Sequence, residues 1–332
     1  TGDKLETAEN IALSCNLVKT DWVTIQIEST EESEVVLGLK RAIASAEELN
    51  KYCPRNISLI IDGDASRFAL SHGDLFYSLC KFCNSIVVSR ASPRQKAEVV
   101  SFIKQKEPKC VTLAVGDGGN DIPMIQAANV GVGIFGNEGN QAADSSDFAI
   151  GKFKFLVPLL FQHGRWTSNR TAFFIQYYFF KNFLFTLPQV YFAFISGFSG
   201  QTLYDDWYLL LFNSAITACG VVMYALFDQD LNYKTEPHVK KHLPALYLEN
   251  RTNEPLTIRK FLNWMFGAFL ISMVVFLVPA YMYDKSVSTQ SGMVEGLWGM
   301  SVCIYTSVIF IVNFILIIQI HNWTWIQHVT IW

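Results

Sequence analysis

The residues best suited to chemistry in this chain are two aspartates, Asp117 and Asp121, within the segment Val115–Met124. The apolar run Cys110–Val115 before them is rich in β-forming residues, which predicts a strand buried on both faces. A Gly-Gly pair between the aspartates lets a ligand approach the backbone, and Pro123 suits the first turn of a helix. The carboxyl end of such a strand opens into a crevice where the helix N-terminus favours an anion. The spacing therefore predicts that the two carboxylates bind Mg²⁺ beside a phosphate group.

A second polar segment, Ser89–Glu98, also follows a short strand-like run. Ser92 is expected to cap a helix that begins at Pro93. Lys96 then falls in the first turn, where a cation opposes the helix dipole. That placement is reasonable for a lysine that faces a phosphoryl oxygen. The opening segment Thr1–Lys4 offers a hydroxyl and a carboxylate ahead of a predicted helix, but alone it is equally consistent with a polar turn.

The composition predicts a chain with two parts. Of its 332 residues, 51% are hydrophobic and 17% are charged, values between those of a soluble domain and a membrane bundle. Most charged residues precede residue 155, and the net charge of -3 gives no indication of nucleic-acid binding. Four apolar stretches follow, at about 171–195, 207–227, 261–283 and 297–320, and residues 323–332 resemble the start of another. Each of the four is long enough to cross a hydrocarbon core of about 30 Å as a helix.

The loops between the apolar stretches predict an orientation in the membrane. Residues 228–260 contain six lysines and arginines, whereas 196–206 contain none and 284–296 contain only Lys285. Because basic loops stay on the cytosolic side, we expect 228–260 to be cytosolic together with residues 1–170.

The first apolar stretch contains Lys181, which lies about 15 Å along a helix, where a charge costs about 3 kcal/mol. Asn182 and Thr186 extend a polar stripe beside it, and Asn213 begins a similar stripe in the second stretch. We expect these four residues to contact a polar substrate. The alternative is that they only join helices by hydrogen bonds. The four stretches contain no aspartate or glutamate, which disfavours a cation pump, whereas a phospholipid headgroup suits a lysine with amide donors.

Together these segments resemble the P-type ATPases, and within them the phospholipid-translocating flippases. The resemblance covers nearly the whole chain and rests on Thr1–Ala8, Pro93–Ala97, Gly116–Met124, His163–Trp166, Tyr178–Phe183, Gly197–Trp207 and Phe227–Asp230. Two departures stand out. Gly119 replaces the usual alanine, and Ala218–Gly220 replaces a proline-containing break, which leaves the identity of the lipid open.

The resemblance implies a haloacid-dehalogenase-like α/β phosphorylation domain, a doubly wound parallel sheet, in residues 1–155. It implies a stalk in 156–170 and an all-α transmembrane helix bundle in 171–332. The implied activity is ATP-driven movement of phospholipid from the exoplasmic to the cytosolic leaflet of a eukaryotic membrane, through an aspartyl-phosphate cycle. The family usually works with a small membrane-spanning accessory subunit.

The resemblance also assigns roles to individual residues. Thr1 would bond the phosphoryl group, Lys96 would offset its charge, and Asp117 with Asp121 would hold Mg²⁺. The residues on the side of the ATP nucleotide would be Gly2, Asp3, Arg90 and Asn120. The family carries its phosphorylated aspartate in an Asp-Lys-Thr-Gly-Thr string, which this sequence lacks. We therefore expect the chain to be the C-terminal part of a longer pump.

Other classes of function remain open from the residues alone. Asp62 and Asp64 have the Asp-x-Asp form that dehalogenase-like phosphatases use for their own nucleophile, which would make the chain a membrane-tethered phosphatase. In that fold the nucleophile precedes the threonine motif, however, and Asp62 follows Thr1. A cation-transporting P-type ATPase is a second alternative, and a truncated product that acts only as a regulatory partner is a third. Cys80 and Cys83 have metal-ligand spacing but no second pair nearby, so free thiols are expected.

Overall fold

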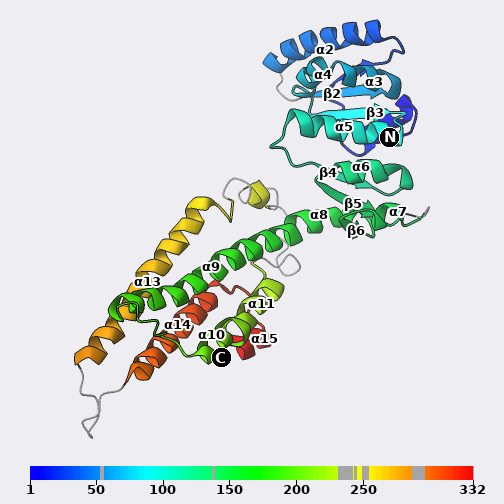
Figure 1. Cartoon of the computed structure of the whole chain (residues 1–332). Helices are drawn as coiled ribbons and strands as arrows, with labels where there is room; N and C mark the ends of the chain where they lie inside the picture. The colour runs from blue at the N-terminus through cyan, green and yellow to red at the C-terminus, as the bar shows by residue number, and fades with distance from the viewer. Residues whose placement is uncertain are drawn as a thin grey trace. The chain divides into compact units, whose positions relative to one another are not determined.

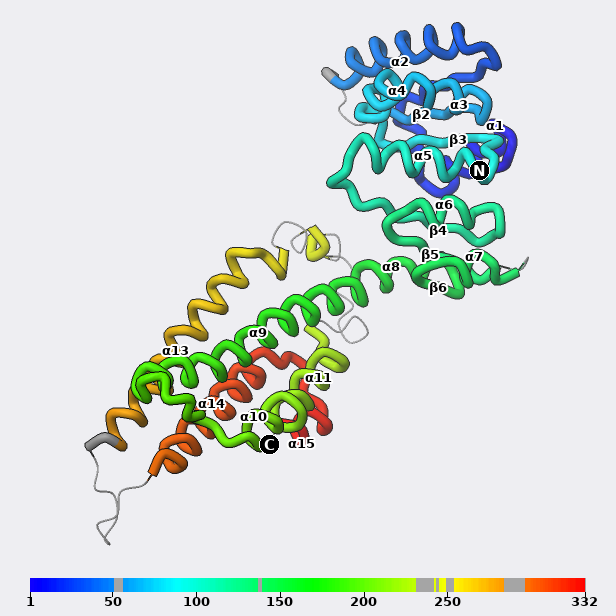
Figure 2. The backbone as a smooth tube through the Cα atoms, viewed as in Figure 1, coloured from blue at the N-terminus to red at the C-terminus, as the bar shows by residue number. Residues whose placement is uncertain are grey.

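The computed structural model describes residues 1–52, 56–136, 139–230, 242, 245–248, 254–285 and 296–331. The chain divides into two compact units, Thr1–Leu156 and Val157–Trp332. Figure 1 shows the strands of the first unit as arrows and the long helices of the second unit as coiled ribbons, and Figure 2 traces the same backbone as a tube; the strands of the described residues all lie in the first unit. Much of the basic loop used to predict the orientation, including Lys234 and Arg251, lies outside the described residues.

The first unit contains two small parallel sheets. One sheet has the order β1 (Val23–Ile27), β2 (Ile57–Asp62), β3 (Ser85–Ser89), and the other has the order β4 (Leu113–Gly116), β5 (Val130–Ile134), β6 (Phe148–Ile150). Their registers place Asp62 opposite Ser89 and Gly116 opposite Gly133. The expected parallel pairing is confirmed, but the six described strands form two sheets rather than one.

Helices cover both faces of the first sheet. These helices are α1 (Leu5–Ser14), α2 (Glu32–Tyr52), α3 (Gly63–Ser71) and α4 (Gly73–Cys80). Leu59 packs in a core with residues of α2, α3 and α4, whereas its neighbour Ile60 packs with residues of α1 and β3. Both side chains are 0% exposed. Burial on both faces explains why β2 reads as a nearly continuous apolar run instead of an alternating one.

The helix α5 (Pro93–Lys106) begins as the sequence predicts. The backbone N–H of Gln95 donates to Ser92 Oγ at 3.3 Å, and the backbone N–H of Ser92 donates to Gln95 Oε1 at 2.8 Å. This reciprocal capping box satisfies two N–H groups that the helix itself leaves unpaired. It therefore fixes Lys96 in the first turn.

The second unit consists of helices. They are a π-helical turn η3 (Leu159–His163), α9 (Gly164–Ile195), α10 (Asp206–Leu211), a second π-helical turn η4 (Phe212–Ile216), α11 (Ala218–Phe227), α13 (Ile258–Lys285), α14 (Leu297–Gln319) and α15 (Trp325–Ile331). Three segments are long and apolar enough to cross a membrane: Asp206–Phe227, Ile258–Tyr283 and Leu297–Gln319. The expected span 171–195 lies within α9, which does not meet that criterion among the described residues.

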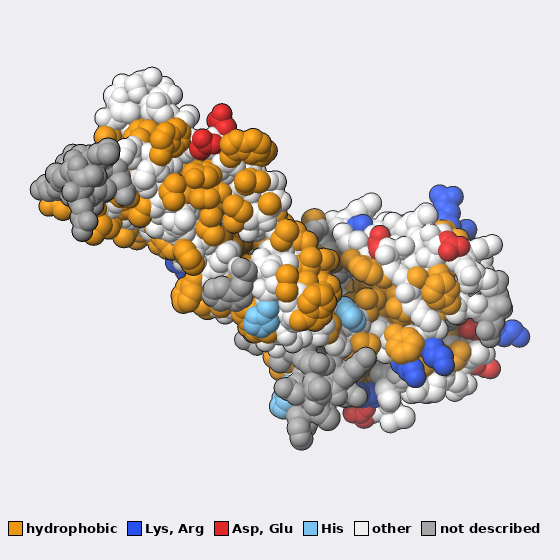
Figure 3. Space-filling view, turned by 90° about the horizontal axis from the view of Figure 1, so that it is seen from below, with side chains coloured by type: hydrophobic (Ala, Val, Ile, Leu, Met, Phe, Trp, Pro, Cys, Tyr) orange, Lys and Arg blue, Asp and Glu red, His pale blue; other side chains and the backbone are white. Residues whose placement is uncertain are grey.

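The core of the second unit is aromatic and follows one face of α9. Phe173, Tyr177, Phe180 and Leu184 recur at helical spacing and are 7% exposed or less. They pack against residues of α11, α13 and α14. Many apolar side chains also lie on the outer surface, as Figure 3 shows over the helical unit, while charged side chains gather on the other unit. Such a surface is typical of a bundle that faces lipid or further helices.

Candidate functional site

Lys96 and Asp121 form the centre of the candidate phosphate site in the first unit. Lys96 Nζ donates to Asp121 Oδ1 at 2.8 Å, and the two side chains are only 19% and 15% exposed. Asp121 ends the short 3-10 turn η1 (Gly119–Asp121), which leads into α6 (Ile122–Ala127). The ion pair therefore ties the first turn of α5 to the turn that follows β4.

Glycine makes this turn possible at one position. A Cβ at Gly116 would lie 2.4 Å from the Cβ of Asp121, which is too close for any other residue. A Cβ at Gly119 would lie 2.4 Å from Oε1 of Gln141, at the start of α7 (Gln141–Asp144). Gln141 thus occupies space that an alanine side chain at residue 119 would need.

The carboxylates present fit a magnesium ion. Asp117 is exposed at the end of β4, and Asp121 uses only Oδ1 for the contact with Lys96. Mg²⁺ usually takes one or two carboxylates and completes its shell with water and phosphate oxygens. No cluster of three or more His, Cys, Asp or Glu residues suited to a metal occurs in the described part of the chain. Two carboxylates completed by water and phosphate oxygens would be a suitable donor set for a hard cation.

Thr1 and Asp3 lie against the end of β3. The backbone oxygen of Asp3 accepts a hydrogen bond from Arg90 N at 2.9 Å, and Thr1 O accepts one from Ala91 N at 2.9 Å. Thr1 Oγ1 donates to Asp3 Oδ2 at 2.6 Å. Arg90 has a φ of 45°, a left-handed conformation that is uncommon for a residue with a side chain. The structure thus brings Thr1, Asp3 and Arg90 together, with Gly2 between the first two.

The backbone nitrogen of Thr1 donates to Val88 O at 2.8 Å, which places Thr1 beside β3. Asn120 is exposed in the turn η1. Thr1, Asp3 and Arg90 thus lie at the carboxyl end of β3, and Asp117, Asn120 and Asp121 follow the carboxyl end of β4.

Asp62 lies at the carboxyl end of β2, where Ser89 Oγ donates to its Oδ1 at 2.9 Å. A Cβ at the next residue, Gly63, would lie 2.6 Å from the backbone oxygen of Arg90. Asp62 is therefore packed beside the left-handed Arg90 and holds a serine of the neighbouring strand.

The second unit buries Lys181 among neutral oxygens. Lys181 is only 1% exposed. Its Nζ donates to Asn213 Oδ1 at 3.0 Å and to Thr217 Oγ1 at 2.8 Å. The rings of Tyr178 and Phe212 lie 5.2 Å and 5.7 Å from Nζ. No ion pair of Lys181 with a carboxylate is found among the described residues. The ammonium of Lys181 is thus hydrogen-bonded, but no carboxylate of the described residues neutralises its charge.

The π-helical turn η4 shapes this contact. It carries Asn213, and Thr217 follows directly and donates its own hydroxyl hydrogen to Phe212 O at 2.5 Å. A π turn leaves the regular ladder of helix hydrogen bonds, and such turns occur frequently at functional sites. The Thr217 hydroxyl can therefore accept from Lys181 while it satisfies a carbonyl of the turn.

The other members of the predicted polar stripe lie elsewhere. Asn182 Nδ2 donates to Tyr178 O at 3.0 Å, and Thr186 Oγ1 donates to Asn182 O at 2.8 Å. Both bonds stay within α9. The structure therefore joins Lys181 with Asn213 but does not bring Asn182 or Thr186 to the same contact.

Comparison with known proteins identifies the family. Residues 143–332 match the family described as phospholipid-translocating P-type ATPase, C-terminal. The chain belongs to the phospholipid-translocating P-type ATPases. This confirms the family predicted from the motifs, and it favours neither the phosphatase nor the cation pump.

Individual relatives cover the whole of this phospholipid-translocating ATPase chain. It is 36% identical over 345 residues to the probable phospholipid-transporting ATPase 4 of Arabidopsis thaliana, with 100% of this chain and 28% of that protein covered. It is 33% identical over 355 residues to phospholipid-transporting ATPase IH of Mus musculus, with coverages of 100% and 30%. The chain therefore spans less than a third of the length of these curated relatives.

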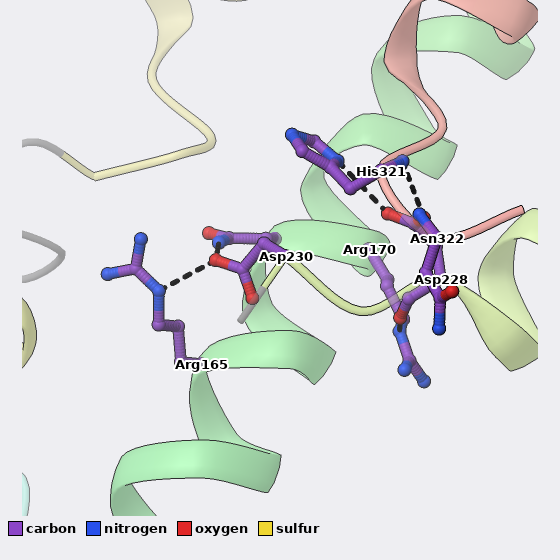
Figure 4. Close-up of polar contacts among 7 residues, drawn as sticks. Arg165, Arg170, Asp228, Asp230, His321 and Asn322 are labelled. Carbon is purple, nitrogen blue, oxygen red and sulfur yellow. Dashed lines mark hydrogen bonds and ion pairs between the residues drawn. The ribbon is translucent and has the colours of Figure 1, made fainter. Parts of the chain in front are cut away.

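In this phospholipid-translocating ATPase chain, sequence reasoning missed a polar cluster where α9, α11 and α14 end or begin (Figure 4). Arg165 Nε donates to Asp230 Oδ2 at 2.8 Å, and Asn169 Nδ2 donates to the same oxygen at 3.2 Å. Asp228 and His321 form a second contact, at 3.2 Å from Oδ2 to Nδ1. The cluster borders a cavity of about 350 Å³. Arg165, Asp228 and Asp230 lie in the segments His163–Trp166 and Phe227–Asp230, which the sequence marked only as family motifs, whereas Asn169 and His321 lie outside them.

Proposed function

We propose that this chain is the C-terminal part of an ATP-driven phospholipid flippase. The whole protein would move phospholipid from the exoplasmic to the cytosolic leaflet through an aspartyl-phosphate cycle. The observation that supports the lipid side best is Lys181, a buried ammonium bound to Asn213 and Thr217. Family membership and the relatives' names support the ATPase side.

The first unit would handle the phosphoryl group as part of a haloacid-dehalogenase-like domain. In the longer protein, Thr1 would donate to a phosphoryl oxygen and Lys96 would offset its negative charge. Asp117 and Asp121 would hold Mg²⁺, which when bound supplies charge neutralisation on the phosphoryl oxygens. The short Lys96–Asp121 contact keeps the ammonium and the carboxylate in place before a substrate arrives. Gly2, Asp3, Arg90 and Asn120 would lie on the nucleotide side.

The second unit would carry part of the lipid path. A phospholipid headgroup always presents a phosphate, so its anionic oxygens could replace the neutral oxygens that Lys181 now contacts. An anion held by a buried ammonium makes a stronger hydrogen bond than a neutral acceptor does. Asn213 would then be free to bond the headgroup, and Asn182 and Thr186 would line the path further along. Residues 1–170 and 228–260 would be cytosolic, and a small membrane-spanning subunit would accompany the protein.

The direct test uses the full-length protein that contains this sequence, reconstituted in vesicles with fluorescently labelled phospholipids. We expect ATP and Mg²⁺ to move labelled lipid between leaflets, as followed by chemical quenching of the outer leaflet. A matched protein with Asp117→Asn should show no transport beyond that of empty vesicles. Transport that persists without ATP, or ATPase activity that no phospholipid stimulates, would refute the proposal.

A further inference from the structure

Two contacts join α9 to the helix formed by α10, η4 and α11, and their spacing matches. On α9, Arg170 precedes Lys181 by 11 residues, and on the other helix Thr217 precedes Asp228 by 11 residues. In a helix eleven residues complete three turns and about 20° more, so Arg170 and Lys181 lie on one face of α9, about 16 Å apart. Thr217 and Asp228 flank α11 at its two ends. Lys181 donates to the Thr217 hydroxyl before the start of α11, and Arg170 donates to the backbone oxygen of Asp228 after its end.

Arg170 caps the end of α11. Its Nη1 donates to the backbone oxygen of Leu226 at 3.0 Å, and its Nε donates to the backbone oxygen of Asp228. The last carbonyl groups of a helix have no partner within the helix, and they carry the negative end of its dipole. A guanidinium with several donors in a fixed plane suits that position. Arg170 therefore fixes both the axial position and the rotation of α11 beside α9.

Asp228 extends this attachment to a third element. Its carboxylate is only 4% exposed, and Oδ1 accepts from the backbone N–H groups of His321 and Asn322 at 2.8 Å and 3.0 Å (Figure 4). These N–H groups lie in the turn between α14 and α15. Nearby, a Cβ at Gly220 of α11 would lie 3.0 Å from Cδ2 of Leu316 in α14, so the two helices pack closely. The end of α11 is thus held on two sides.

We propose that Arg170 and Asp228 are positioning residues that set the register of α11 against α9, and thereby hold Asn213 and Thr217 at Lys181. This inference rests on the proposed function. Lys181 must exchange its contacts with the helix for contacts with a headgroup, and the Arg170 anchor keeps the two helices aligned during that exchange. Neither positioning residue touches the lipid, so both act only through the geometry of the Lys181 site.

The experiment measures lipid-stimulated ATPase activity of the full-length protein across phospholipid concentrations. We expect Arg170→Ala and Asp228→Asn each to raise the lipid concentration for half-maximal activity by about tenfold, the effect of losing charge-assisted hydrogen bonds. Phosphorylation by ATP without lipid should stay normal. The double variant should be no worse than the poorer single variant, because one attachment is already lost. Arg170→Lys should recover part of the shift, since an ammonium still donates to the carbonyl groups.

Arg165→Ala is the matched control. Arg165 is another partly buried arginine of α9, but its side chain donates to Asp230 and to Leu246 O rather than to the carbonyl groups that end α11. An equal shift in this control would show a general loss of packing and would overturn the proposal. So would a lower maximal rate or less folded protein with an unchanged half-maximal concentration in Arg170→Ala.

A parallel Lys181→Ala variant separates this inference from the proposed function. If Lys181→Ala shifts the lipid dependence and Arg170→Ala does not, the positioning role is wrong while the lipid role of Lys181 stands. If neither variant shifts it, the lipid role fails first. If both variants shift the lipid dependence and Arg165→Ala does not, the result supports the positioning role of Arg170.

Discussion

At the scale of single residues, the two aspartates of the β4 turn are not equivalent. Oδ1 of Asp121 accepts a hydrogen bond from Lys96, whereas Asp117 is exposed. We predict that Asp117→Asn in the full-length protein abolishes acid-stable phosphoenzyme from ATP, because an amide would replace the charged carboxylate proposed to bind Mg²⁺. Incorporation of radioactive phosphate from ATP into the protein measures the amount of phosphoenzyme. Asp62→Asn is the control and should still form phosphoenzyme; if it fails while Asp117→Asn succeeds, the nucleophile lies at Asp62 and the phosphatase alternative returns.

Lys181 carries the residue-scale prediction for the membrane unit. Lys181→Ala should raise the phospholipid concentration for half-maximal ATPase activity roughly tenfold or more, and should slow lipid-stimulated dephosphorylation. Phosphorylation by ATP should stay near normal, because no phosphate-site residue is among the contacts of Lys181. Lys181→Arg should recover only part of the affinity, since a planar fork does not replace a compact charge. An unchanged lipid dependence with a lower melting temperature would instead mark Lys181 as a structural residue.

The Cys80 and Cys83 thiols provide a test of local burial. Burial raises the pKa of Cys80 to about 12, with a smaller contribution from Cys83, and raises the pKa of Cys83 to about 11. Both therefore stay protonated and unreactive at pH 8, whereas Cys15 and Cys110 are exposed. We predict that iodoacetamide at pH 8 modifies the exposed pair first, as mapped by peptide mass spectrometry. Rapid modification of Cys80 in folded protein would contradict the burial.

At the scale of elements, the sequence predicted best what depends on neighbours along the chain. The capping box at Ser92 needs only residues three apart, and the apolar run of β2 reports its own burial. Asn182 and Thr186 bond to carbonyl groups of α9, and their contact with lipid stays a prediction, because periodicity gives a face of a helix but not the partner of that face. The π-helical turn that presents Asn213 and Thr217 was also not predictable, because it depends on packing against α9.

Close packing of α11 on α14 gives a prediction for one element. A Cβ at Gly220 would lie 3.0 Å from Leu316, whereas a Cβ at Gly267 of α13 meets nothing within 4 Å. We predict that Gly220→Val lowers stability by about 1–3 kcal/mol through overpacking. Gly267→Val is the control, and it should be neutral or slightly stabilising because glycine is a poor helix former. Melting temperatures in detergent compare the two, and equal effects would contradict the tight α11–α14 contact.

At the scale of the whole molecule, composition predicted a charged part and an apolar part, because long stretches in contact with water are rich in charged residues and long stretches in contact with lipid are apolar. The structure has strands in one unit and membrane-length helices in the other. The sequence could not reveal the cluster around Asp228, whose partners Arg170 and His321 lie 58 and 93 residues away. Contacts at such separations leave no periodic signal, so only Asp228 stood in a family motif, and its partners Arg170 and His321 were not marked.

The last prediction concerns the 332-residue chain by itself. It contains Lys96, Asp117 and Asp121 of the proposed phosphate site, but not the Asp-Lys-Thr-Gly-Thr string that, by the resemblance, would carry the nucleophile. We predict no acid-stable phosphate incorporation from ATP, while Mg²⁺-dependent binding of nucleotide or phosphate persists weakly, because the binding groups do not need the nucleophile to fold. Titration of a fluorescent nucleotide with and without Mg²⁺ measures that binding, and Asp117→Asn should abolish its Mg²⁺ dependence. The longer protein, assayed in parallel, should form phosphoenzyme. Covalent phosphate on Asp62 of the 332-residue chain would contradict this prediction, because Asp62 would then be a nucleophile in its own right.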